Sequence, residues 1–144
     1  MKPRRQAVPQ QLKQQIMEDA KYRCGYCLTQ QRIIGRPLSM EHLLPVARGG
    51  ETTRTNLWLA CRRCNEFRGA RTEALDPTTG IVAPLFNPRT QSWSAHFIWS
   101  DDSTEIIGLT PTGRATVSAL RLNNADIIQA RGLWVLIGLH PPSD

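Results

Sequence analysis

Two Cys-x-x-Cys pairs constrain this chain more than any other feature. Cys24 and Cys27 form the first pair, Cys61 and Cys64 form the second, and 33 residues (28–60) lie between them. Two such pairs supply the four thiolates of a tetrahedral structural zinc site. The sequence therefore predicts one structural Zn²⁺ bound by these cysteines, with Gly25 easing the first turn. Because the interval is longer than in a simple zinc ribbon, we expect it to hold structure of its own.

Two disulfides or a redox site are the alternative uses of the four cysteines. The N-terminal MKPRRQAVPQQ is basic but is not followed by the apolar segment of a secretory signal. Disulfides are therefore disfavoured, and we expect a cytoplasmic protein. The uncharged run Gly132–Pro142 is too short to cross a bilayer, so no membrane association is expected.

Charge is distributed unevenly along the chain. Residues 1–75 hold 14 basic and 6 acidic residues, whereas residues 76–144 hold 4 basic and 6 acidic ones. A localised positive field indicates a polyanionic partner, most simply nucleic acid, although a lopsided charged surface on any globular domain gives the same count. Residues 1–8 are predicted to be a loose basic arm.

Hydrophobic spacing predicts an α+β fold. Leu12, Ile16 and Ala20 recur at helical spacing and predict a helix from Pro9 to about Lys21. Strands over 37–45 and 57–60, followed by a helix over 62–75 with a weak spot at Gly69, form a predicted ββα unit.

The second half is predicted to be a β-hairpin followed by helices. Alternating Trp93, Ala95, Phe97 and Trp99 predict a strand, with Ser100–Ser103 as the turn and 104–109 as the partner strand. A further strand is predicted over 81–86, and helices over 111–122 and 124–138, with Thr110 and Asn124 as caps. We expect residues 1–75 and the extension 76–144 to form one compact unit.

A series of short motifs between and after the cysteine pairs resembles the HNH endonuclease family. The motifs are Glu41-His42-Leu-Leu-Pro45, Arg48-Gly-Gly, Asn56-Leu and Cys61-Arg-Arg-Cys64-Asn65-Glu-Phe-Arg68-Gly69. The resemblance covers about residues 20–70. It implies a ββα-metal (His-Me finger) core around one catalytic metal ion and braced by a four-cysteine zinc site. The block after residue 85 resembles the extension of many small prokaryotic HNH proteins.

The resemblance also implies residue roles. His42 corresponds to the general base that takes a proton from the attacking water. Glu41 and Asn65 correspond to ligands of the catalytic metal, and Asn56 corresponds to the residue that orients the loop and the base. Because both expected ligands are oxygen donors, Mg²⁺ or Mn²⁺ is favoured. Adjacent strand residues face opposite ways, so Glu41 and His42 can serve one site only if the strand twists or bulges.

The expected substrate is DNA, with RNA left open. Arg62, Arg63, Arg68 and Arg71 are predicted to contact phosphates beside the cleavage site. A non-catalytic zinc-knuckle module that only binds nucleic acid, or a subunit of a larger nuclease or defence complex, is the alternative. Whether a homodimer or a protein partner supplies specificity stays open, as does the choice between nicking and double-strand cutting.

Overall fold

The computed structural model describes residues 7–143, so most of the predicted basic arm lies outside the described residues. The helices are α1 (Gln10–Asp19), α2 (Gln31–Ile34), α3 (Arg62–Arg68), α4 (Trp93–His96), α5 (Pro111–Ala119) and α6 (Ala125–Leu136), with short 3-10 turns η1 (Val46–Arg48) and η2 (Arg54–Asn56). The strands are β1 (Ser39–His42), β2 (Leu57–Ala60), β3 (Glu73–Leu75), β4 (Val82–Pro84), β5 (Phe97–Trp99) and β6 (Ile106–Gly108). The strands pair as three separate two-stranded ladders, β1–β2, β3–β4 and β5–β6.

The predicted ββα unit is confirmed as β1, β2 and α3. β1 and β2 are antiparallel, with Glu41 opposite Trp58 and His42 opposite Leu57. β2 ends at Ala60, and Cys61 is the N-cap of α3. β1 is shorter than the predicted strand over 37–45. The chain turns into η1 after Pro45, which ends the ladder on that side.

The helix predicted over 62–75 ends at Arg68. Gly69 adopts a φ of +55°, which closes the helix, and residues 73–75 form β3 instead. β3 pairs with β4 in a hairpin whose turn contains Asp76 and Gly80. The prediction extended the helix because its basic residues gave no stop signal after the glycine.

The strand predicted over 93–99 was wrong in its first half. Residues 93–96 form the single helical turn α4, and only 97–99 form β5. The indole N–H of Trp93 donates to the carbonyl of Tyr26 at 2.9 Å. This tertiary contact with the first cysteine loop outweighs the alternating pattern, as packing commonly outweighs strand propensity.

The hairpin β5–β6 and the two C-terminal helices agree with the prediction in type and order. Thr110 caps α5 by accepting from the Gly113 N–H at 3.0 Å, and Asn124 caps α6 by accepting from the Ile127 N–H at 3.1 Å. Both helices end two or three residues before the predicted positions.

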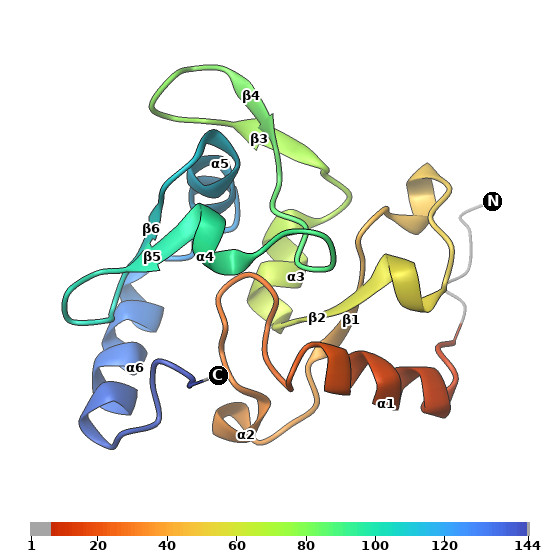
Figure 1. The fold of residues 1–144 in the computed structure, drawn as a ribbon, viewed down its shortest axis with the longest axis horizontal. Coiled ribbons are helices and arrows are strands. Elements are labelled where there is room, and N and C mark those ends of the chain that lie inside the picture. Colours follow the sequence, from red (N-terminus) through yellow and green to blue (C-terminus); the bar gives the residue numbers. More distant parts are fainter. Residues whose placement is uncertain (1–6, 144) are drawn as a thin grey trace.

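One core joins the two halves of the chain. It contains Ile16, Leu57 and the four cysteines together with Phe97, Ile106 and Leu122 from the second half. Figure 1 shows α1 and the β1–β2 ladder on one side of the molecule and β5–β6 and α6 on the other, with α3 between them. Within residues 7–143, no helix has both the length and the apolar character required to cross a membrane.

Candidate active site

The four cysteines lie together and are buried. Their sulfur atoms all fall within 4.8 Å of one another, and no other group of three or more His, Cys, Asp or Glu side chains in residues 7–143 is arranged to hold a metal ion. The Sγ atoms of Cys27 and Cys61 are 3.7 Å apart. A tetrahedral site with Zn–S bonds of about 2.3 Å has sulfur–sulfur separations of about 3.8 Å. The cluster therefore fits the predicted zinc ion.

The pKa values of the thiols in the cluster are shifted in opposite directions. Burial raises the pKa of the Cys24 thiol well above its usual range. Hydrogen bonds from the neighbouring thiols, Cys24 first, lower the pKa of Cys27 well below its usual range. The hydroxyl of Thr29 adds a contact of 3.1 Å to the Cys27 sulfur. When zinc is bound, its charge replaces these thiol protons and makes all four ligands thiolates.

Gly25 is required by packing. A Cβ at this position would lie 2.4 Å from Cδ1 of Trp58 and 2.8 Å from Cβ of Pro88. The left-handed residue of this loop is Leu28, with a φ of +58°, so the predicted conformational role of Gly25 was misplaced. The Gly25 N–H donates to the carbonyl of Leu59 at 2.9 Å, which joins the first cysteine pair to β2.

The second cysteine pair starts α3 and thereby positions Asn65. The Cys61 sulfur accepts from the Cys64 N–H at 3.5 Å, and the Cys61 carbonyl accepts from the Asn65 N–H at 2.9 Å. Asn65 and Arg68 are three residues apart, so they share one face of the helix. That face is turned toward β1.

Glu41 meets this face of α3. Its Oε2 accepts from the Asn65 amide at 2.8 Å, and its Oε1 accepts from the Arg68 guanidinium at 2.6 Å. Arg68 also donates to the carbonyls of His42 and Leu43. Glu41 is 2% exposed and Arg68 is 4% exposed, so this ion pair is buried.

His42 has different neighbours. Its Nε2 lies 3.0 Å from Oγ1 of Thr52, and either atom can donate, depending on the imidazole tautomer. The β1–β2 pairing continues in register through Glu41 and His42, so the two side chains leave the ladder on opposite faces. The ladder contains no bulge between them. Half-buried His42 also lines a hollow beside α1, which Glu41 does not line.

Asn56 ties the ends of the loop between β1 and β2 together. Its side-chain oxygen accepts from the Leu44 N–H at 2.8 Å, and its amide donates to the carbonyls of Leu44 at 3.0 Å and Glu51 at 2.8 Å. A Cβ on Gly50 would lie 1.8 Å from the Leu44 oxygen, so only glycine fits there. This arrangement is what an orienting asparagine requires.

Sequence reasoning missed a second anchor of this loop. Asp19 at the end of α1 accepts two hydrogen bonds from Arg54, at 2.8 and 2.9 Å, and one from Arg89 at 3.0 Å. The Arg54 guanidinium, more than that of Arg89, lowers the pKa of Asp19 below its usual value. Asp19, Arg54 and Arg89 are far apart in the sequence, so no local sequence pattern predicts their contact. Thr52 was missed for the same reason.

The four arginines predicted to contact phosphates do not share one exposed face. Arg62 is exposed and forms an i,i+4 ion pair with Glu66, whereas Arg63 is half-buried. Arg71 is exposed but donates to carbonyls at the end of α3 and to that of Ala119. Arg68 donates to the protein acceptors around Glu41, and this position does not favour contact with phosphate.

A catalytic cation would find two oxygen-bearing side chains at Glu41 and Asn65. Mg²⁺ binds through one or two carboxylates and keeps several waters, so a donor set of this kind suits it chemically. Arg68 takes one carboxylate oxygen of Glu41, and the other faces Asn65. The amide of Asn65 is oriented with its nitrogen toward the carboxylate.

Comparison with known families gives one match. Residues 24–71 match the family model described as HNH endonuclease. The matched range begins at the first zinc-site cysteine, contains β1, β2 and α3, and ends just after α3, so the resemblance read from the sequence is confirmed over this part of the chain. No curated protein and no solved structure matches the chain.

Proposed function

We propose that this chain is a metal-dependent endonuclease that hydrolyses phosphodiester bonds in DNA. The observation that carries the proposal is the match of residues 24–71 to the HNH endonuclease model, in a segment where β1 contains Glu41 and His42, α3 contains Asn65, and four cysteines cluster at the start of α3. A nuclease of this kind needs a base for the attacking water and a positive charge at the phosphate.

His42 acts as the general base in this proposal. A neutral imidazole accepts a proton efficiently near pH 7, and His42 is half-buried at the rim of an open hollow. The Thr52 hydroxyl, 3.0 Å from Nε2, orients the ring. Asn56 keeps the intervening loop closed and so fixes the position of Thr52 relative to β1.

Glu41 and Asn65 would hold the catalytic cation, and β1 would have to twist at its end for that ion and His42 to reach one phosphate, because the two side chains leave the ladder on opposite faces. When bound, such an ion supplies Lewis-acid stabilisation of the charge that develops on the phosphate oxygens. Arg68 holds the Glu41 carboxylate against α3, and the four-cysteine site fixes the start of that helix. Zinc is structural in this scheme, and Mg²⁺ or Mn²⁺ is the catalytic ion.

A binding module without catalysis is the second candidate. It would keep the cysteine cluster and the basic charge but would not need His42 or Asn65. Both residues are present within the matched domain, and Asn65 contacts Glu41, which favours the enzyme.

Plasmid nicking by purified, zinc-loaded protein tests the proposal. We expect the wild type to relax supercoiled DNA with Mg²⁺ or Mn²⁺, and His42→Ala to lose this activity while it retains zinc and DNA affinity. His96→Ala is the matched control, because His96 lies in α4 and contacts Thr110, not the proposed site. Nicking by His42→Ala at the wild-type rate would rule out this base.

A further inference from the structure

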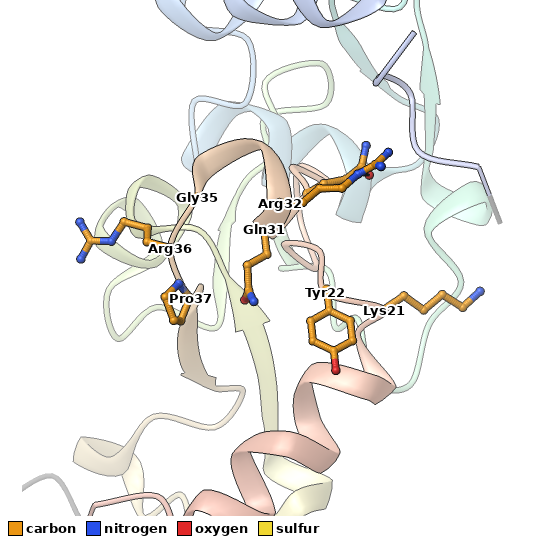
Figure 2. Close-up of a pocket in the computed structure, with 8 residues that line it drawn as sticks. Lys21, Tyr22, Gln31, Arg32, Gly35, Arg36 and Pro37 are labelled. Carbon is orange, nitrogen blue, oxygen red and sulfur yellow. Dashed lines mark hydrogen bonds between the residues drawn. The ribbon is translucent and has the colours of Figure 1, made fainter.

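A hollow in the surface is lined by residues that come just before and just after the first cysteine pair in the chain. Its volume is about 580 Å³, and it is lined by residues between Lys21 and Pro37. Figure 2 shows Gln31 in its middle, with Arg36 and Pro37 on one side and Tyr22, Lys21 and Arg32 on the other. We call this hollow the 21–37 pocket.

The 21–37 pocket is basic. Residues 20–40 include Lys21, Arg23, Arg32 and Arg36 and no acidic residue. Lys21, Arg32 and Arg36 line the pocket and are exposed, and Arg32 is held by a hydrogen bond of 2.9 Å from its Nε to the Gln30 side chain. Cations on both sides of one hollow suit a polyanion that lies across it.

The pocket is firmly attached to the domain. Tyr22 accepts a hydrogen bond of 2.9 Å from Gln14 of α1, and Gln31 accepts one of 3.1 Å from the Leu38 N–H just before β1. Glu18 is the acidic side chain next to this edge, and it is held by Gln14 at 3.1 Å. The segments that carry the basic side chains are therefore tied to α1 and to the residue just before β1, the strand that contains His42.

A second hollow adjoins the pocket and reaches His42. This groove, about 460 Å³ in volume, lies between α1 and β1 and is lined by Lys13 and Met17 on one side and by Met40 and His42 on the other. Pro37 lines both the groove and the 21–37 pocket, so the two hollows are neighbours on the surface.

The chain between Pro37 and His42 limits how far apart the two hollows can lie. Five residue steps separate these residues, and they span at most roughly 17 Å at about 3.3 Å per extended residue. At about 3.4 Å of rise per nucleotide in one strand of a duplex, a short duplex can reach from one hollow to the other.

We propose that the 21–37 pocket is a second DNA-contact site, in which Arg32, Arg36 and Lys21 bind backbone phosphates other than the phosphate at His42. This inference rests on the proposed function, because it takes the His42 end of the groove as the cleavage site. Such contacts fix how the duplex lies on the domain and do not read its sequence.

DNA affinity tests the pocket separately from cleavage. All variants carry His42→Ala and bound zinc, and binding to a labelled duplex is measured by fluorescence anisotropy over a range of salt concentrations. Arg32→Gln/Arg36→Gln is compared with Ala125→Glu/Gln129→Glu on the exposed face of α6, which lowers the net charge by the same amount. Zinc content and circular dichroism establish that each variant is folded.

We expect the pocket variant to bind DNA roughly tenfold or more weakly. The slope of the logarithm of its binding constant against the logarithm of the salt concentration should be shallower by about 1.8, or about 0.9 for each lost phosphate contact. The α6 variant should keep the original salt dependence. Equal effects in both variants, or no effect in the pocket variant, would overturn the proposal. If Arg32→Gln/Arg36→Gln does not fold, Lys21→Gln and Arg36→Gln are tested singly against Gln129→Glu by the same criteria.

The two proposals can fail independently. If the protein with His42 intact does not nick DNA, the proposed function fails, whereas selective weakening of binding by the pocket variant still shows where the duplex lies. If nicking depends on His42 but the pocket variant binds like the α6 variant, the second contact site fails alone.

Discussion

At the scale of single residues, Glu41 has two roles. It is a proposed ligand of the catalytic metal, and its carboxylate forms an ion pair in the interior of the protein. Glu41 is buried, and its charge is balanced by Arg68, which also donates to the backbone carbonyls of His42, the last residue of β1, and of Leu43 after it. A buried ion pair contributes little net stability over apolar residues of the same size, but removing one partner leaves an uncompensated charge. Arg68 is therefore a positioning residue whose loss affects the whole ββα unit.

We expect Arg68→Ala to lower the free energy of unfolding by about 3–5 kcal/mol, because Glu41 is left charged and buried. Arg62→Ala on the same helix removes the exposed ion pair with Glu66. This change should alter the free energy of unfolding by less than about 1 kcal/mol. Urea unfolding of zinc-loaded protein measures both. The double variant Glu41→Gln/Arg68→Ala should be less destabilised than the two single changes predict together, and full additivity would contradict the coupling.

At the scale of elements, the segment after α6 is fastened to the β5–β6 hairpin through His140. This residue is 6% exposed, its Nε2 lies 3.0 Å from the Ser103 carbonyl, and its ring packs edge-on against Trp99 and Trp134. Burial, and to a lesser degree the Arg131 cation, lower the pKa of His140 below its usual value. Because a carbonyl oxygen only accepts, Nε2–H of His140 donates to Ser103, and the lowered pKa favours the neutral imidazole in the folded protein.

The thermal stability of the protein should consequently fall as the pH is lowered. Unfolded His140 binds a proton below about pH 6.5 while the folded form resists it, so stability is present above that pH and is lost toward the folded pKa. Thermal unfolding of zinc-loaded protein between about pH 7.5 and pH 5.5 measures this dependence. His140→Gln should show a weaker dependence than the wild type, and equal dependence in the two proteins would exclude His140 as its source.

The elements differ in how well they can be predicted from the sequence. The β1–β2–α3 unit could be predicted because its signals are local: cysteine spacing, a Gly-Gly turn and a short apolar strand before Cys61. The caps Thr110 and Asn124 are equally local. By contrast, β3–β4 exposes Leu75, Ile81 and Val82, so it lacks the alternation of a half-buried hairpin. The ion pairs of Glu41 and Asp19 join distant positions and have no sequence signature.

At the scale of the whole molecule, the cysteine cluster lies within the core that both halves of the chain build. The same core contains Phe97, Ile106, Leu120 and Leu122 from the second half. Because binding energy at a structural zinc site is folding energy, removal of the ion should loosen the C-terminal half as well as the ββα unit. The chain is expected to behave as one cooperative unit.

Tryptophan fluorescence can show this coupling. Trp93, Trp99 and Trp134 lie outside the segment that binds zinc, and Trp58→Phe leaves these three as the reporters. We expect chelation of zinc from Trp58→Phe to shift the emission to longer wavelength and added zinc to reverse the shift. Unchanged emission after complete zinc removal would show that residues 76–144 hold their structure independently.

Because the four cysteines are buried, their reaction with a thiol reagent reports opening of the folded protein. The chain has no other thiol, and all four are buried in the folded state. A maleimide can therefore react only with molecules in which the fold has opened. Mass spectrometry then gives the fraction of molecules that carry the label. At low reagent concentration the labelling rate measures the fraction of molecules that are open, and at high concentration it approaches the rate of opening, with no probe introduced into the sequence.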